Sequence, residues 1–146
     1  MRWIAIRGRA RKADARQIVP MKALRDPRCL LVESRWLVPR HFDGISLGPI
    51  VLLRPGVSAG LIAHELVHVR QFWRRPFTHG PRYLLSKAYR QACEVEAYRA
   101  QLQAAGRTPS RIANLARYLA TKYRLDLDEE TAVRLLSVVS ADDSPP

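Results

Sequence analysis

The hydrophobic period of this chain changes abruptly at Pro55-Gly56, and that change limits the folds it can adopt. Before it, short apolar runs of strand length occupy residues 29–38, 45–47 and 50–53. After it, apolar residues recur every three or four positions, as they do in amphipathic helices. The sequence therefore predicts an α+β fold, with a small antiparallel sheet in the N-terminal third followed by a bundle of about four helices.

Turn residues separate the apolar runs of the N-terminal third. Asp43-Gly44 precedes the second run, and Gly48-Pro49 lies between the second and the third. Short strands joined by such turns pair as antiparallel neighbours. One or two strands are expected within residues 29–38, which Pro39 closes, and a further short strand at residues 2–7.

Start and stop signals predict the helices. Serine or threonine before an apolar run favours an N-cap, proline favours the first turn, and glycine favours the residue after the helix. These signals predict a first helix from Ser58 to just before Pro76, a second over residues 81–105, a third over residues 109–123, and a fourth that begins near Asp128.

Length and composition predict one domain. The 146 residues fit a single domain, assigned to residues 1–141, with a disordered tail at residues 142–146. The two cysteines, Cys29 and Cys93, are far apart and form no C-x-x-C motif, which favours a reducing compartment. The sequence has no signal-peptide pattern and no apolar stretch of membrane-spanning length, so a cytoplasmic protein is expected. The oligomeric state is left open.

The chain is strongly basic. It contains 25 Lys and Arg residues against 13 Asp and Glu residues, a formal charge of +12. Nucleic acids, anionic membrane surfaces and acidic substrates are therefore candidate partners. The basic residues are scattered, however, and no zinc finger or aromatic RNA-binding motif accompanies them. Nucleic-acid binding stays an alternative that no motif supports.

The first predicted helix carries a His-Glu-x-x-His motif at His64, Glu65 and His68. A step of four residues is slightly more than one helical turn, so both imidazoles lie on one face and can bind one ion. Zinc in a catalytic site takes three protein ligands and a water whose pKa it lowers. Glu65 would be the general base that accepts the proton of this water. The alternative is a chance match on an amphipathic helix.

The third ligand is expected from the second long helix. A longer motif with a further glycine and histidine is absent, because Gln71 and Arg74 occupy those positions. Glu94 and Glu96 both offer a carboxylate on a helix that can pack against the first. We prefer Glu94, and Glu96 replaces it if the helix is rotated.

These residues resemble the gluzincin metallopeptidases, and in particular the compact minigluzincin-like group. The resemblance covers residues 45–102 and includes the Glu-x-x-Ala pattern at Glu94 and Ala97. It implies a zincin-like fold, one Zn²⁺ held by His64, His68 and Glu94, and Glu65 as the catalytic base. It further implies that Tyr98 lies next to the ligands, and that a peptide or protein substrate pairs with the edge of a strand at residues 46–53. Gly48-Pro49 departs from a smooth edge.

The sequence thus predicts zinc-dependent hydrolysis of peptide bonds. The alternatives are a non-catalytic zinc-stabilised interaction module and a basic nucleic-acid or anionic-surface binder. No residue is identified as the donor that stabilises the oxyanion. His79 is expected to be an exposed loop histidine, and Phe72 and Trp73 are expected to pack in the core.

Overall fold

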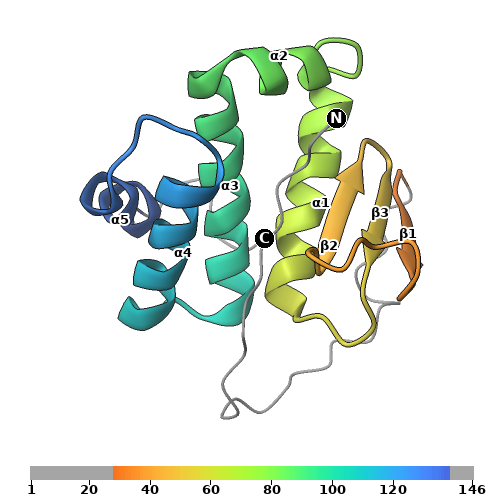
Figure 1. Cartoon of the computed structure of the whole chain (residues 1–146), viewed down its shortest axis with the longest axis horizontal. Coiled ribbons are helices and arrows are strands. Elements are labelled where there is room, and N and C mark those ends of the chain that lie inside the picture. The colour runs from red at the N-terminus through yellow and green to blue at the C-terminus, as the bar shows by residue number, and fades with distance from the viewer. Residues whose placement is uncertain (1–27, 139–146) are drawn as a thin grey trace.

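A computed structural model describes residues 28–138, which form a small sheet followed by helices (Figure 1). The strand expected at residues 2–7 and the tail at 142–146 lie outside the described residues. Within them the α+β expectation is confirmed. The elements are β1 (Leu30–Glu33), β2 (Gly44–Leu47), β3 (Ile50–Leu53), α1 (Ala59–Arg74), α2 (His79–Leu85), α3 (Lys87–Ala105), α4 (Pro109–Lys122) and α5 (Glu129–Ser137).

The sheet is mixed, so the prediction of a purely antiparallel sheet is wrong. Its strand order is β1-β3-β2, with β2 antiparallel and β1 parallel to β3. A tight turn sets the direction of two strands only when they are neighbours, and β1 and β2 flank β3 instead. Only one strand forms within residues 29–38, because Ser34 Oγ accepts hydrogen bonds from the backbone N–H groups of Trp36 and Leu37 and turns the chain away.

Gly48-Pro49 forms the two-residue loop of the β2–β3 hairpin, in which Leu47 pairs with Ile50. Gly48 has φ +65°, a value that glycine adopts without strain, and Pro49 cannot share it because its ring fixes φ near −65°. This combination fits a type II′ turn, whose twist matches the flanking strands. The proline therefore lies beyond the end of β2 and leaves that edge strand uninterrupted.

The helix boundaries follow the capping signals. The hydroxyls of Ser58 and Thr108 and the carboxylate of Asp128 accept backbone hydrogen bonds at the starts of α1, α4 and α5, as expected. The single helix expected over residues 81–105 is instead two. Ser86 has extended backbone angles and its hydroxyl accepts from Tyr89 N, which makes it the N-cap of α3. This serine signal lay inside the predicted helix, so the described residues contain five helices rather than about four.

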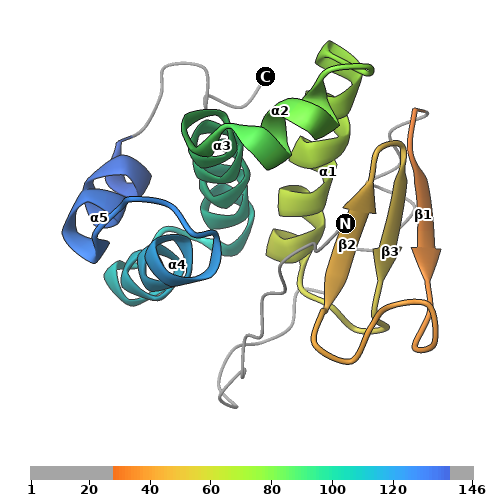
Figure 2. The same cartoon turned by 45° about the horizontal axis from the view of Figure 1, so that its top comes forward.

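Two hydrophobic cores flank the α1–α3 pair. One lies between the sheet and α1 and includes Val51, Leu53 and Ile62. The other joins α3, α4 and α5. The two central helices run side by side in opposite directions, and α2 crosses from the end of one to the start of the other (Figures 1 and 2). A Cβ at Gly60 would lie 3.1 Å from the backbone oxygen of Gln101, so glycine permits this close approach.

The two aromatic residues near the end of α1 differ in exposure. Trp73 was expected in the core, but it is 43% exposed and donates its indole N–H to the backbone oxygen of Arg28. Phe72 is partly buried next to Gly48. No helix within residues 28–138 combines the length and the apolar character needed to cross a membrane.

Candidate metal centre

The two motif histidines present their Nε2 atoms to each other from one face of α1. These atoms are 3.2 Å apart, and the ring centroids are 4.9 Å apart. His64 is buried and His68 is partly exposed. Two imidazoles that converge on one point through the same ring atom have the arrangement that chelation of one ion requires.

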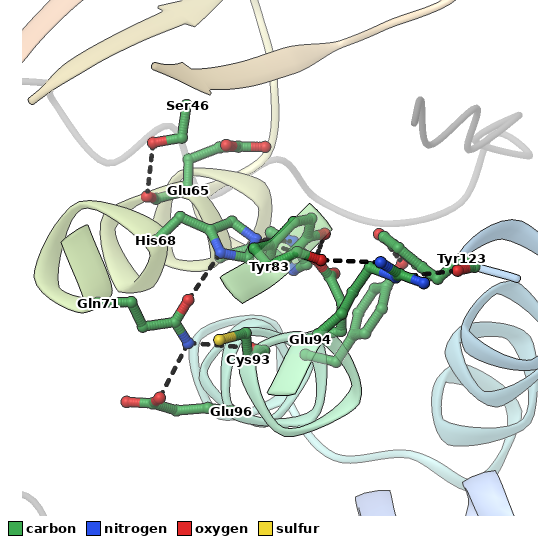
Figure 3. Close-up of polar contacts among 12 residues, drawn as sticks. Ser46, Glu65, His68, Gln71, Tyr83, Cys93, Glu94, Glu96 and Tyr123 are labelled. Atoms are coloured by element: carbon green, nitrogen blue, oxygen red, sulfur yellow. Dashed lines mark hydrogen bonds and ion pairs between the residues drawn. The ribbon is translucent and has the colours of Figure 1, made fainter. Parts of the chain in front are cut away.

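Glu94 of α3 completes this cluster (Figure 3). Its Oε2 lies 3.7 Å from His64 Nε2, and its Oε1 lies 3.6 Å from His68 Nε2. Two ligand atoms bound tetrahedrally to one zinc at the usual bond lengths are about 3.3 Å apart, so the spacing fits such an ion. Glu94 Oε2 is also buried without a hydrogen-bond partner among the described residues. A cation would compensate this costly burial of a carboxylate oxygen.

Glu96, the alternative ligand, lies outside the cluster. Its Oε1 accepts from Arg74 Nη1 at 2.9 Å and its Oε2 accepts from Gln71 Nε2 at 2.9 Å. Residues two positions apart on an α-helix point about 200° apart, so Glu94 and Glu96 point to different sides of α3. The structure thus joins His64 and His68 to Glu94.

Gln71 is a supporting residue that the sequence did not reveal. Its side-chain NH₂ donates to the backbone oxygen of Cys93 at 3.0 Å and to Glu96, so its Oε1 is the atom that faces His68 Nδ1, at 2.9 Å. The Oε1 can only accept, and His68 must therefore carry its proton on Nδ1. This tautomer leaves the lone pair of Nε2 directed at the cluster.

Tyr83 is a second supporting residue that the sequence did not reveal. Its hydroxyl donates to Glu94 Oε1. Burial, and next the nearby charge of Glu94, raise the pKa of Tyr83, so that it stays a donor. This bond fixes the carboxylate while its other oxygen remains directed toward His64. Tyr83 comes from α2, whose separate existence the sequence did not predict.

Tyr98 lies against the cluster, as the resemblance implied. Its ring packs edge-on against His64, with centroids 4.7 Å apart, and its hydroxyl lies 3.0 Å from that of Tyr123. Burial lowers the pKa of His64 well below its usual value, and the charge of His68 lowers it further. His64 is therefore held in the neutral form that binds metal ions.

Glu65 lies beside the ligands and under β2. Burial is the main cause that raises its pKa to about 7. A Cβ at Gly44 would lie 3.2 Å from Glu65 Oε1, so glycine leaves room for the carboxylate. Ser46 Oγ donates to the Glu65 backbone oxygen at 3.4 Å. These contacts hold strand and motif helix together at the site.

His79 is buried, so the expectation of an exposed loop histidine is wrong. It is 6% exposed because its backbone N–H donates to the Arg75 oxygen and begins α2, which turns the side chain inward. Its Nδ1 lies 3.0 Å from the Tyr89 hydroxyl. Burial lowers its pKa, and the charge of His68 adds to this effect.

A pocket connects the cluster with solvent. It encloses about 660 Å³ of empty space, part of it open to solvent. One wall is formed by β2 and its flanking residues, and the other by the helices that carry the cluster. The lining residues are Phe42, Gly44, Ile45, Ser46, Gly48, Leu61, His64, Glu65, His68, Phe72, His79, Tyr83, Glu94 and Tyr123.

Comparisons of this chain with protein-family models, with curated proteins and with solved structures find no match. The geometry of the site itself indicates what it can do. That geometry is a buried group of two histidines and one glutamate, whose ligand atoms lie within 4.8 Å of one another and which can hold a metal ion.

Proposed function

We propose that this chain is a zinc-dependent enzyme that hydrolyses peptide bonds. The observation that carries the proposal is the convergence of His64, His68 and Glu94 in a pocket that also contains the carboxylate of Glu65. Two imidazoles and one carboxylate are a donor set that zinc prefers, and three protein ligands leave a position for water.

Glu65 is the proposed general base. When bound, zinc supplies Lewis-acid chemistry that lowers the pKa of a water molecule toward neutrality. The Glu65 carboxylate accepts the proton of this water and then passes it to the leaving amine. Its burial strengthens the interactions of its charge, and Gly44 gives it space on the substrate side.

The outer edge of β2, which pairs with no strand within residues 28–138, supports a peptide as the substrate. In the hairpin, Leu47 forms a hydrogen-bonded pair with Ile50, so the alternation directs the N–H and C=O groups of Gly44 and Ser46 away from β3. Gly44 and Ser46 both line the pocket. An extended peptide paired with them would lie along the same wall as Glu65.

His79 is the proposed donor to the oxyanion. The Tyr89 hydroxyl lies against its Nδ1, so an Nε2–H tautomer is available to the pocket that His79 lines. A neutral imidazole N–H stabilises negative charge that develops on a carbonyl oxygen.

Metal content and cleavage test the two parts of the proposal separately. Purified protein should bind one equivalent of zinc, and His64→Ala, His68→Ala and Glu94→Ala should each reduce it, as read by mass spectrometry and by competition with a chelator. Glu96→Ala is the matched control and should retain the metal. Absence of stoichiometric zinc in the wild type would refute the site.

Peptide cleavage is measured with a library of unstructured peptides. Glu65→Gln should keep the zinc and abolish cleavage, because an amide cannot accept the proton. If the zinc-loaded wild type cleaves no peptide, the non-catalytic zinc module is the better reading. If the chain instead binds nucleic acid with a steep salt dependence and no zinc, the nucleic-acid alternative is favoured.

A further inference from the structure

The outer face of α2 carries apolar side chains on the side opposite the metal cluster. His79 and Tyr83, four residues apart, form the buried face of this helix. Leu85 points about 200° away from Tyr83 on the helical wheel and is 87% exposed, and Leu84 is 44% exposed. Phe77, which precedes the helix, is 91% exposed. These apolar side chains pack in neither hydrophobic core, and exposed apolar groups of this kind can mark an interaction surface.

This surface is at the periphery of the molecule. The α2 helix crosses the ends of α1 and α3 with its outer side turned away from the sheet and from the other helices (Figures 1 and 2). A helix rises about 1.5 Å per residue, so α2 spans only about 9 Å from His79 to Leu85, and Phe77 lies two residues before its start. The three exposed apolar side chains therefore belong to one short segment of the chain.

Basic residues are frequent in the part of the chain that carries this group. Residues 66–93 contain six basic residues and no acidic residue, although the whole chain has 13 acidic residues. Arg74 and Lys87 form ion pairs with Glu96 and Asp126. Within residues 28–138, neither Arg75 nor Arg82 forms an ion pair with a carboxylate, and the exposed Arg82 guanidinium lies over the Tyr89 ring, 5.2 Å from its centroid. We name Phe77, Leu84, Leu85, Arg75 and Arg82 the α2 rim.

We propose that the α2 rim binds the surface of a bilayer that contains anionic phospholipids. Arginine guanidinium groups pair with phosphate oxygens in a bidentate manner, and adjacent apolar side chains enter the boundary between headgroups and acyl chains. Amphipathic segments with basic residues bind anionic leaflets through both contributions.

The size and the charge of the α2 rim argue against other occupants. A stable protein interface buries about 800 Å² on each partner, more than three protruding apolar side chains supply. A second copy of the chain would bring the same positive charge to the contact. Residues 1–27 carry eight basic and two acidic residues, so their charge is not complementary either. An anionic bilayer matches both the apolar group and the arginines.

Vesicle sedimentation with the full chain tests this proposal without any metal or substrate. The wild type should sediment with vesicles of equal parts phosphatidylcholine and phosphatidylglycerol, and much less with phosphatidylcholine alone. Binding should weaken as salt is added, because screening reduces the attraction between arginine and phosphate. Absence of binding, or equal binding to both kinds of vesicle, would overturn the proposal.

Paired variants locate the contact. Each basic residue near an anionic surface contributes about fivefold in affinity, so Arg75→Gln with Arg82→Gln should weaken binding about 30-fold. Phe77→Ser with Leu85→Ser should weaken it by about tenfold or more. All four side chains are exposed, so the fold should be retained, which circular dichroism checks.

The loop between β1 and β2 provides matched controls, because it also exposes basic and apolar side chains. Arg35→Gln with Arg40→Gln makes the same change of net charge, and Trp36→Ser with Leu37→Ser removes a similar exposed apolar area. Both controls should bind vesicles like the wild type. Wild-type binding by the α2 variants, or an equal loss in the controls, would refute the assignment to the α2 rim.

Discussion

Replacement of Gln71 with leucine tests whether an outer hydrogen bond orients a metal ligand. Leucine has a similar volume but cannot accept the proton of His68 Nδ1 or donate to Cys93 O and Glu96, so three hydrogen bonds are lost. Losing such an outer partner usually costs about 10- to 100-fold in metal affinity. We therefore expect zinc to bind Gln71→Leu about 30-fold more weakly, a difference of about 2 kcal/mol.

Two of these three hydrogen bonds, those to Cys93 O and Glu96, connect α1 to α3, so the metal-free variant should lose folding stability. Each net hydrogen bond contributes about 1 kcal/mol, which gives a loss of about 2 to 3 kcal/mol in the free energy of unfolding. Denaturant unfolding of the metal-free protein measures this loss. Chelator competition at a denaturant-free condition, where both proteins are folded, measures the zinc affinity separately.

A nitrogen-15 spectrum of metal-free protein provides the direct test. The wild type should show His68 with its proton on Nδ1, and Gln71→Leu should show a mixture of both tautomers. Arg74→Ala is the matched control, since its ion pair with Glu96 is largely exposed and weak. An Nε2–H tautomer in the wild type, or unchanged zinc affinity in Gln71→Leu, would refute the reasoning.

Three further predictions concern the surroundings of the site. In the metal-free protein the pKa of Glu65 is raised from 4.5 to about 7, so stability is lost as pH rises through this range. The free energy of unfolding of Glu65→Gln should then exceed that of the wild type by about 3 kcal/mol at pH 8. Below about pH 4.5 the two should be equal, and denaturant unfolding measures both values. Tyr83→Phe should weaken zinc binding about tenfold in chelator competition, because the glutamate ligand loses its donor; an unchanged affinity would exclude that role. Gly60→Ala should lower the melting temperature by several degrees, because the added Cβ crowds the Gln101 backbone. Gly80→Ala is the control and should not lower it, because a Cβ there meets no atom within 4 Å. Equal melting temperatures for the two variants would contradict the close approach of α1 and α3.

Local signals allowed the prediction of the motif helix. Ser58 caps its start, Pro76 prevents its continuation, and the four-residue step places both histidines on one face; each of these effects acts within a few residues. The clustering of Glu94 with the histidines could be expected in part, because a helix that packs on another presents one face. Glu96 was the alternative ligand, and only the orientation of α3 in the folded protein excludes it.

The remaining site residues depend on tertiary placement. Tyr83 and His79 reach the site because Ser86 breaks the expected helix and lets α2 turn across it, and that capping serine lies within an otherwise helical pattern. Gln71 follows His68 by three residues, so the spacing predicts that both lie on one face of α1. The role of Gln71, however, depends on the acceptors that α3 supplies. The parallel pairing of β1 likewise depends on which edge of β3 was free.

The location of the cluster between the two hydrophobic cores has a mechanical consequence. Two donors belong to the helix that packs on the sheet, and the third belongs to the helix that packs on α4 and α5. An ion held by all three would act as a cross-link between the halves of the protein, closing the stretch of chain that runs through α2. Its release would remove this cross-link and leave the two central helices joined only by their own contacts, such as those of Gly60 and Gln71, so metal supply would change the rigidity of the pocket between them.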